Sequence, residues 1–98
     1  MQGGDGADPL GAIHVTPLTV MLDGCLVHII EVIRSKLFDT KWYHVVLRID
    51  CGTIKTRTFT IPARSNRELK EKIRAEIAKI KMLAFVAGPD FAREVVGG

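Results

Sequence analysis

The chain has 98 residues, with a hydrophobic share of 47%, a charged share of 26% and a formal net charge of +3 at pH 7. This length fits one domain, and the composition argues against a fully disordered chain. The longest uninterrupted apolar run, residues 82–87, is far shorter than the ~20 residues that a membrane-spanning helix needs. We also find no charged-then-apolar leader with a small-residue cleavage site, so we expect a cytoplasmic protein with no membrane partner.

The charge is unevenly distributed along the chain. Residues 1–31 hold four acidic residues and neither Lys nor Arg, and all 14 basic residues lie from Arg34 onward. A mildly basic chain of this kind is compatible with a nucleic-acid partner or an acidic protein partner.

The first eleven residues are poor in apolar side chains and hold four glycines, two aspartates and a proline. This composition predicts a mobile N-terminal tail at 1–11, followed by a single domain at 12–98. The GGDG run at residues 3–6 lacks the preceding strand and the following GK[ST] of a phosphate-binding loop. We therefore assign no site to it.

Four segments rich in Val and Ile predict β-strands at residues 13–22, 25–34, 42–49 and 53–61. Pro17 places the first strand at a sheet edge, and Pro62 is expected to end the last one. Asp23-Gly24 is typical of a two-residue hairpin turn, residues 35–41 are expected to form a longer loop, and the chain turns again at Cys51-Gly52. These short connections predict an antiparallel meander.

A long amphipathic helix follows the strands. Ser65 is a favourable N-cap and Glu68 completes a capping box, while Gly88 and Pro89 mark the end of the helix. Between them, apolar residues recur at three- and four-residue spacing. A short helix is expected after Pro89. The predicted fold class is therefore α+β, a four-stranded antiparallel β-meander followed by one long amphipathic helix and a short C-terminal helix.

The expected hairpin registers sort the strand residues into two faces. The face assigned to the long helix carries Leu18, Val20, Leu22, Val27, Ile29, Glu31, Ile33, Tyr43, Val45, Leu47 and Ile49. The opposite face is expected to carry Val15, Met21, Leu26, His28, Ile30, Val32, Trp42, His44, Val46 and Arg48. If Cys51-Gly52 is a two-residue turn, Lys55, Arg57, Phe59 and Ile61 join this second face. One helix cannot cover both faces, so the second is expected to leave an apolar patch exposed.

The cysteines and histidines are candidates for metal binding or catalysis, but we interpret them as structural residues. The expected register places Cys25 opposite Cys51, but we predict reduced, unbonded cysteines, with a disulfide or a metal site as alternatives. His28, His44 and Arg48 share a face on which no nucleophile converges with them. No catalytic motif occurs in the sequence. We therefore expect a non-enzyme with no catalytic residues, no metal and no cofactor.

The basic residues lead to the functional prediction. We expect a small non-enzymatic nucleic-acid-binding protein, acting as a dimer or a complex subunit, in which basic side chains contact phosphates and aromatic side chains stack. The candidate nucleic-acid-binding residues are Trp42, His44, Arg48, Lys55, Arg57, Phe59, Arg64, Arg67, Lys70, Arg74 and Lys81. The alternative is a protein–protein assembly module whose exposed sheet face is a homodimer or partner interface. Its candidate interface residues are Val15, Ile30, Val32, Val46 and Phe59.

The layout from Trp42 to about Lys81 resembles the arm-type DNA-binding domains of tyrosine recombinases. The resemblance rests on WYHVVLRID, the following turn, KTRTF and a charged helix, which together make a small sheet followed by a helix. The strands before Trp42 do not belong to that pattern. We transfer no residue roles from the resemblance.

Overall fold

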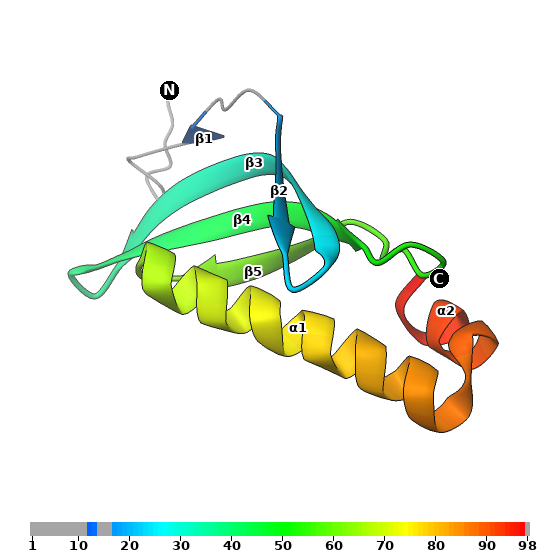
Figure 1. The fold of residues 1–98 in the computed structure, drawn as a ribbon. Coiled ribbons are helices and arrows are strands. Elements are labelled where there is room, and N and C mark those ends of the chain that lie inside the picture. The colour runs from blue at the N-terminus through cyan, green and yellow to red at the C-terminus, as the bar shows by residue number, and fades with distance from the viewer. Residues whose placement is uncertain (1–11, 14–16, 98) are drawn as a thin grey trace.

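The computed structural model describes residues 12–13 and 17–97 and shows an antiparallel sheet crossed on one face by a long helix (Figure 1). The predicted α+β class is confirmed. The predicted tail at 1–11 and the candidate interface residue Val15 lie outside the described residues. No helix in the described part of the chain is long and apolar enough to cross a membrane.

The sheet is a meander in which two short strands pair with different parts of the same neighbouring strand. β1 (Ala12–Ile13) and β2 (Leu18–Leu22) both pair with β3 (Cys25–Leu37), which pairs with β4 (Thr40–Asp50), and β4 pairs with β5 (Phe59–Ala63). All of these pairings are antiparallel. Pro17 immediately precedes β2, which agrees with its predicted place at a sheet edge.

The first hairpin has the predicted register. Leu22 pairs with Cys25, and the pairing continues to Leu18 opposite Ile29. Asp23 and Gly24 form the turn with φ values of 51° and 83°. Both angles lie in the left-handed region that a type I′ turn requires, and Asp and Gly adopt that region more readily than most residues.

The second hairpin is longer than predicted. β3 and β4 continue to a two-residue turn at Phe38 and Asp39, both with positive φ, so the expected loop at 35–41 is wrong. A β-bulge at Ile30 also shifts the register, because Ile29 pairs with Leu47 whereas Glu31 pairs with Val46. An extra residue in one strand moves every later side chain of that strand to the other face.

The bulge corrects several face assignments. Val32 pairs with Val45 and packs against the core, so its predicted place on the open face is wrong. Glu31 and Ile33, expected on the helix-covered face, instead have the register of the open face. The charged side chain of Glu31 is therefore not on the helix-covered face of the sheet.

The last strand also differs from the prediction. Residues 51–58 form a loop in place of a two-residue turn, and β5 begins at Phe59, which pairs with Leu47. This register puts Phe59 and Ile61 on the helix-covered face, so their predicted place on the open face is wrong. Pro62 lies within β5, which is an edge strand and tolerates a residue without an N–H donor.

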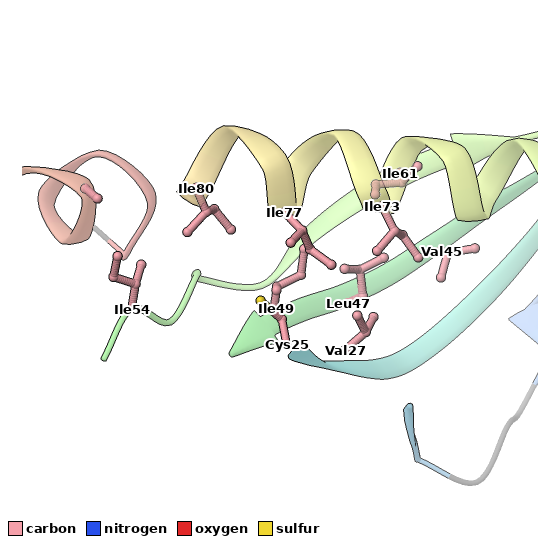
Figure 2. Packing of buried hydrophobic residues seen from close by; sticks show 11 residues of the cluster. Cys25, Val27, Val45, Leu47, Ile49, Ile54, Ile61, Ile73, Ile77 and Ile80 are labelled. Carbon is pink, nitrogen blue, oxygen red and sulfur yellow. The ribbon is translucent and has the colours of Figure 1, made fainter. Parts of the chain in front are cut away.

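Helix α1 (Asn66–Ala87) has the predicted ends. The Ser65 Oγ accepts a hydrogen bond from the Glu68 N–H at 3.1 Å, and the Gly88 N–H donates to the Ala84 carbonyl at 3.0 Å. Gly88 has a φ of 93°, which favours glycine at the end of a helix. Figure 2 shows Ile73, Ile77 and Ile80 pointing from α1 toward the sheet. Their partners in the core include Val27, Val45, Leu47 and Ile49.

Helix α2 (Pro89–Gly97) packs beside the last turns of α1, so it does not cover the open face of the sheet (Figure 1). Its Ala92 is fully buried, and the Val96 carbonyl accepts a hydrogen bond from the Arg57 N–H at 3.1 Å. The short helix therefore closes the core at the end of the sheet where β4 leads into the 51–58 loop.

The two cysteines form a disulfide between the start of β3 and the residue after β4. The prediction of reduced cysteines is therefore wrong, although the predicted register did bring Cys25 and Cys51 together. The bond closes a loop with a sequence separation of 26 residues, which includes the whole second hairpin.

Candidate nucleic-acid interface

The second hairpin continues beyond the strands that flank it. β5 pairs with β4 only from Tyr43 onward, and β1 pairs with β3 no further than Ile33. Among the described residues, the two strands beyond those points pair only with each other. Figure 1 shows this end of the hairpin projecting past the first turn of α1. We call residues 34–42 the arm.

Basic side chains gather on one face of the arm. Lys36 and Lys41 lie directly opposite each other, and both are exposed. Arg34 follows the same alternation and has the register of that face. At the tip, the Phe38 side chain is 91% exposed. The arm therefore presents two exposed lysines, a half-buried arginine and an uncovered aromatic ring.

The other face of the arm ends in a cation–aromatic cluster at the edge of β5. The Arg64 guanidinium lies 5.4 Å from the centre of the Trp42 ring, and the Lys72 Nζ lies 6.0 Å from it. Glu68 joins the two cations, with oxygens 3.3 Å from the Arg64 Nε and 3.7 Å from the Lys72 Nζ. These contacts bring the start of α1 against the base of the arm.

The Glu68 carboxylate also completes the helix cap in an unexpected way. It accepts a hydrogen bond from the Arg64 backbone N–H at 2.6 Å, one residue before the position that a standard capping box uses. The side-chain hydrogen bond from Arg64 is the main cause that lowers the pKa of Glu68, and the backbone hydrogen bond acts in the same direction. Glu68 is therefore held in its charged form near the first turn of α1.

Positive charge is concentrated at this end of the molecule. Residues 34–42 and 64–72 together contain seven basic and three acidic residues, a net charge of +4, whereas the whole chain carries +3. The seven basic residues are Arg34, Lys36, Lys41, Arg64, Arg67, Lys70 and Lys72. We call these two segments the arm end. The remainder of the chain is therefore close to neutral.

A shallow hollow lies at the base of the arm on the open face. It measures about 240 Å³ and is lined by Ser35, Leu37, Trp42, His44 and Pro62. The Ser35 Oγ and the His44 Nε2 lie 2.9 Å apart, within hydrogen-bonding distance. The first hairpin has a similar pair, because the Thr19 Oγ1 lies 2.9 Å from the His28 Nδ1. Hydroxyl–imidazole pairs between neighbouring strands thus recur in both hairpins, which is typical of a structural role.

The structure brings only part of the predicted nucleic-acid-binding set together. Trp42 lies in the arm and His44 at its base, Arg64 lies just before α1, and Arg67 and Lys70 lie on the first turns of α1. Arg48 is on the open face, where it pairs with His28.

The other members of the set lie elsewhere. Lys55 and Arg57 are in the loop at the opposite end of β4, beside α2, and Phe59 is partly buried against the core. Asp23 engages two more, because its carboxylate lies 3.5 Å from the Arg74 Nε and its carbonyl accepts a hydrogen bond from Lys81. The predicted basic surface is therefore divided between several parts of the molecule.

Sequence reasoning missed four residues of the arm end, namely Arg34, Lys36, Lys41 and Lys72. Arg34 falls at the end of an expected strand, and Lys36 and Lys41 fall in an expected loop. Residue spacing in a loop does not indicate which side chains share a face. A two-residue turn at Phe38-Asp39 would have revealed Lys36 opposite Lys41. That turn contains no glycine or asparagine, so its sequence gives little indication of it.

Neither a metal centre nor a relative identifies the site. In the part of the chain that the structure describes, no group of three or more His, Cys, Asp or Glu side chains is placed to hold a metal ion. No protein-family model, no curated protein and no solved structure matches the chain. The functional argument therefore rests on the geometry and charge of the arm end.

Proposed function

We propose that this is a small non-enzymatic nucleic-acid-binding protein that contacts the phosphate backbone through its arm end. The observation that supports this most is the direct pairing of Lys36 with Lys41 on two exposed strands. Like charges directly opposite each other destabilise a sheet. A polyanion offsets that repulsion, because each phosphate oxygen can accept hydrogen bonds from both ammonium groups.

The shape of the arm supports the same proposal. A two-stranded β-ribbon fits the major groove of B-form DNA, and exposed apolar side chains can insert between base steps in the minor groove. The arm is such a ribbon, and Phe38 is exposed at its tip. We expect Arg64, just before α1, and Arg67, in its first turn, to contact the backbone beside the groove.

The first test uses charge reversal at the arm. A labelled duplex DNA of about 20 base pairs and an RNA of the same length are titrated with the protein at low salt and followed by fluorescence anisotropy. We expect Lys36→Glu/Lys41→Glu to weaken binding by at least about tenfold. The control Lys79→Glu/Arg93→Glu changes the net charge equally at two exposed sites outside the arm end, and we expect it to bind nearly as tightly as the parent. Equal weakening in both variants would contradict a site at the arm.

A second candidate function is self-assembly through the open face of the sheet. The observation that favours it is that neither helix covers this face, on which Ile33 and Val46 are only half-buried and Ile30 is 43% exposed. Of the interface residues predicted from the sequence, Ile30 and Val46 remain available, whereas Val32 and Phe59 turn toward the core. Sedimentation of the parent and of Val46→Lys tests this alternative, which requires a dimer that the substitution dissociates.

The disulfide restricts the cellular setting that we propose. Most cytosols keep thiols reduced, but intracellular proteins of hyperthermophiles are an exception and are rich in disulfides. A cytoplasmic nucleic-acid-binding protein with a Cys25–Cys51 bond therefore fits an organism of that kind.

A further inference from the structure

An apolar groove lies between β2 and α1, separate from the arm. It measures about 350 Å³. Its apolar lining comes from Val20, Leu22 and Ile29 on the sheet and from Leu69 and Ile73 on the helix. Lys70 and Asn66 add polar groups from the first turns of α1. The groove is thus apolar, with a basic residue at its border.

One wall of the groove is a strand with an unpaired edge. Within the described residues, β2 pairs only with β3. Because Leu22 and Cys25 close a two-residue turn, Leu22, Val20 and Leu18 direct their N–H and C=O groups toward β3. Thr19 and Met21 therefore direct theirs to the free edge. These backbone groups can form hydrogen bonds with another strand.

Within the described residues, the free edge of β2 lacks several of the usual protections against strand addition, although Pro17 lies just before it. Natural edge strands carry charged side chains, bulges or a covering element. β2 carries no charged residue and pairs with β3 without a bulge. Its Met21 side chain is 67% exposed and Leu18 is 52% exposed. An apolar, uninterrupted edge of this kind is typical of a binding edge.

The charge around the groove indicates whether the strand that pairs with this edge is acidic or basic. The flank of α1 that faces β2 carries Lys70, Arg74 and Lys81. Asp23 meets Arg74 and Lys81 at the hairpin end, whereas no ion pair of the described residues involves Lys70. A second copy of the chain, paired β2 to β2, would bring two such basic flanks face to face. An acidic partner is complementary to this surface.

We propose that the β2 edge and the groove bind an extended acidic peptide of another protein by β-strand addition. The peptide backbone pairs with Thr19 and Met21, and alternate apolar side chains enter the groove between the sheet and α1. Because alternate side chains of a strand point to opposite faces, an acidic side chain near Lys70 lies on the same face as the apolar ones, two residues along the peptide from one of them. This site lies outside the arm, although it shares Lys70 with the arm end, and it does not require that the arm bind nucleic acid.

The test uses a seven-residue peptide blocked at both ends, with glutamate at positions 1 and 7, valine at positions 3 and 5 and threonine between them, so that glutamate and valine share one face. Its matched control has lysine in place of both glutamates. Binding to the full chain is measured by fluorescence anisotropy. We expect saturable binding of the acidic peptide, at least about tenfold tighter than that of the basic one. Lys70→Glu should weaken acidic-peptide binding by about tenfold, whereas Lys79→Glu, on the opposite flank of the same helix, should not.

Backbone pairing has its own test. Met21→Pro removes an N–H that points to the free edge while keeping the pairing with β3, and we expect it to weaken binding by about tenfold. If this variant fails to fold, an acidic peptide N-methylated at alternate residues tests the same hydrogen bonds on the unaltered protein and should also bind about tenfold more weakly.

Four results would overturn the proposal. The first is that the acidic peptide shows no saturable binding, and the second is that both peptides bind equally. The third is that N-methylation has no effect. The fourth is a dimer in sedimentation that Met21→Pro dissociates, which would identify a second copy as the occupant of the edge.

Discussion

Lys36 of β3 and Lys41 of β4 lie directly opposite each other, one pair away from the turn at the tip of the second hairpin. Residues in such pairs have Cβ atoms about 4.5–5.5 Å apart, so the two ammonium groups repel each other in the isolated protein. Arg34 has the register of the same face. This arrangement costs stability and is readily explained if the arm meets an anionic partner.

Replacing Ser65 by Ala should lower the free energy of unfolding by about 1 kcal/mol. The reason is that the Ser65 Oγ accepts the Glu68 N–H at the start of α1, and alanine leaves that donor without its cap. Urea denaturation followed by circular dichroism measures the change. An unchanged midpoint would show that the cap does not stabilise the helix.

Replacing Ile77 by Ala should cost about 2–5 kcal/mol, because its side chain is fully buried between α1 and the sheet and its removal leaves a cavity. The matched control is Phe85→Ala on the same helix, where the side chain is 90% exposed and the expected change is within about 0.5 kcal/mol. Equal destabilisation by both substitutions would contradict the orientation of α1.

The unreduced protein should contain no free thiol when unfolded and treated with a thiol reagent, because Cys25 and Cys51 are bonded. Reduction should lower the free energy of unfolding by about 2–4 kcal/mol, since the unfolded chain regains the freedom that the closed loop removes. Detection of two free thiols without a reducing agent would contradict the bond.

The stability of the parent should fall more steeply with acid than that of Glu68→Gln. Arg64 lowers the pKa of Glu68 below its ordinary value of 4.5 in the folded state. A lowered folded-state pKa stabilises the protein above the unfolded-state pKa, and this stabilisation is lost as pH falls through the folded-state value. Thermal unfolding of both proteins between pH 7 and about pH 3 tests this. Parallel pH profiles would show that the Arg64–Glu68 contact is not maintained in solution.

The sequence predicted the parts of the fold that depend on strong local preferences. Asp23-Gly24 sets the first register because both residues tolerate positive φ, and Ser65, Glu68 and Gly88 mark the ends of α1. The class of the fold followed from these elements and from the order of the strands.

The errors arose where the determining feature has no local pattern. The bulge at Ile30 lies in an uninterrupted apolar run, and the turn at Phe38-Asp39 holds two non-glycine residues at positive φ. Together they turned Val32 to the core and hid the pairing of Lys36 with Lys41. The sequence therefore predicted that the candidate site is basic and aromatic, but it identified only some of the residues that the structure brings together.

The salt dependence of DNA binding tests the central claim most directly. Each lysine that no longer neutralises a phosphate should reduce the slope of log K against log salt concentration by about 0.9, so Lys36→Gln/Lys41→Gln should reduce it by about 1.8. The control Lys79→Gln/Arg93→Gln should keep the slope of the parent, because both residues lie outside the arm end. A parent protein that does not bind at low salt, or a slope that the arm substitutions leave unchanged, would contradict binding through the arm.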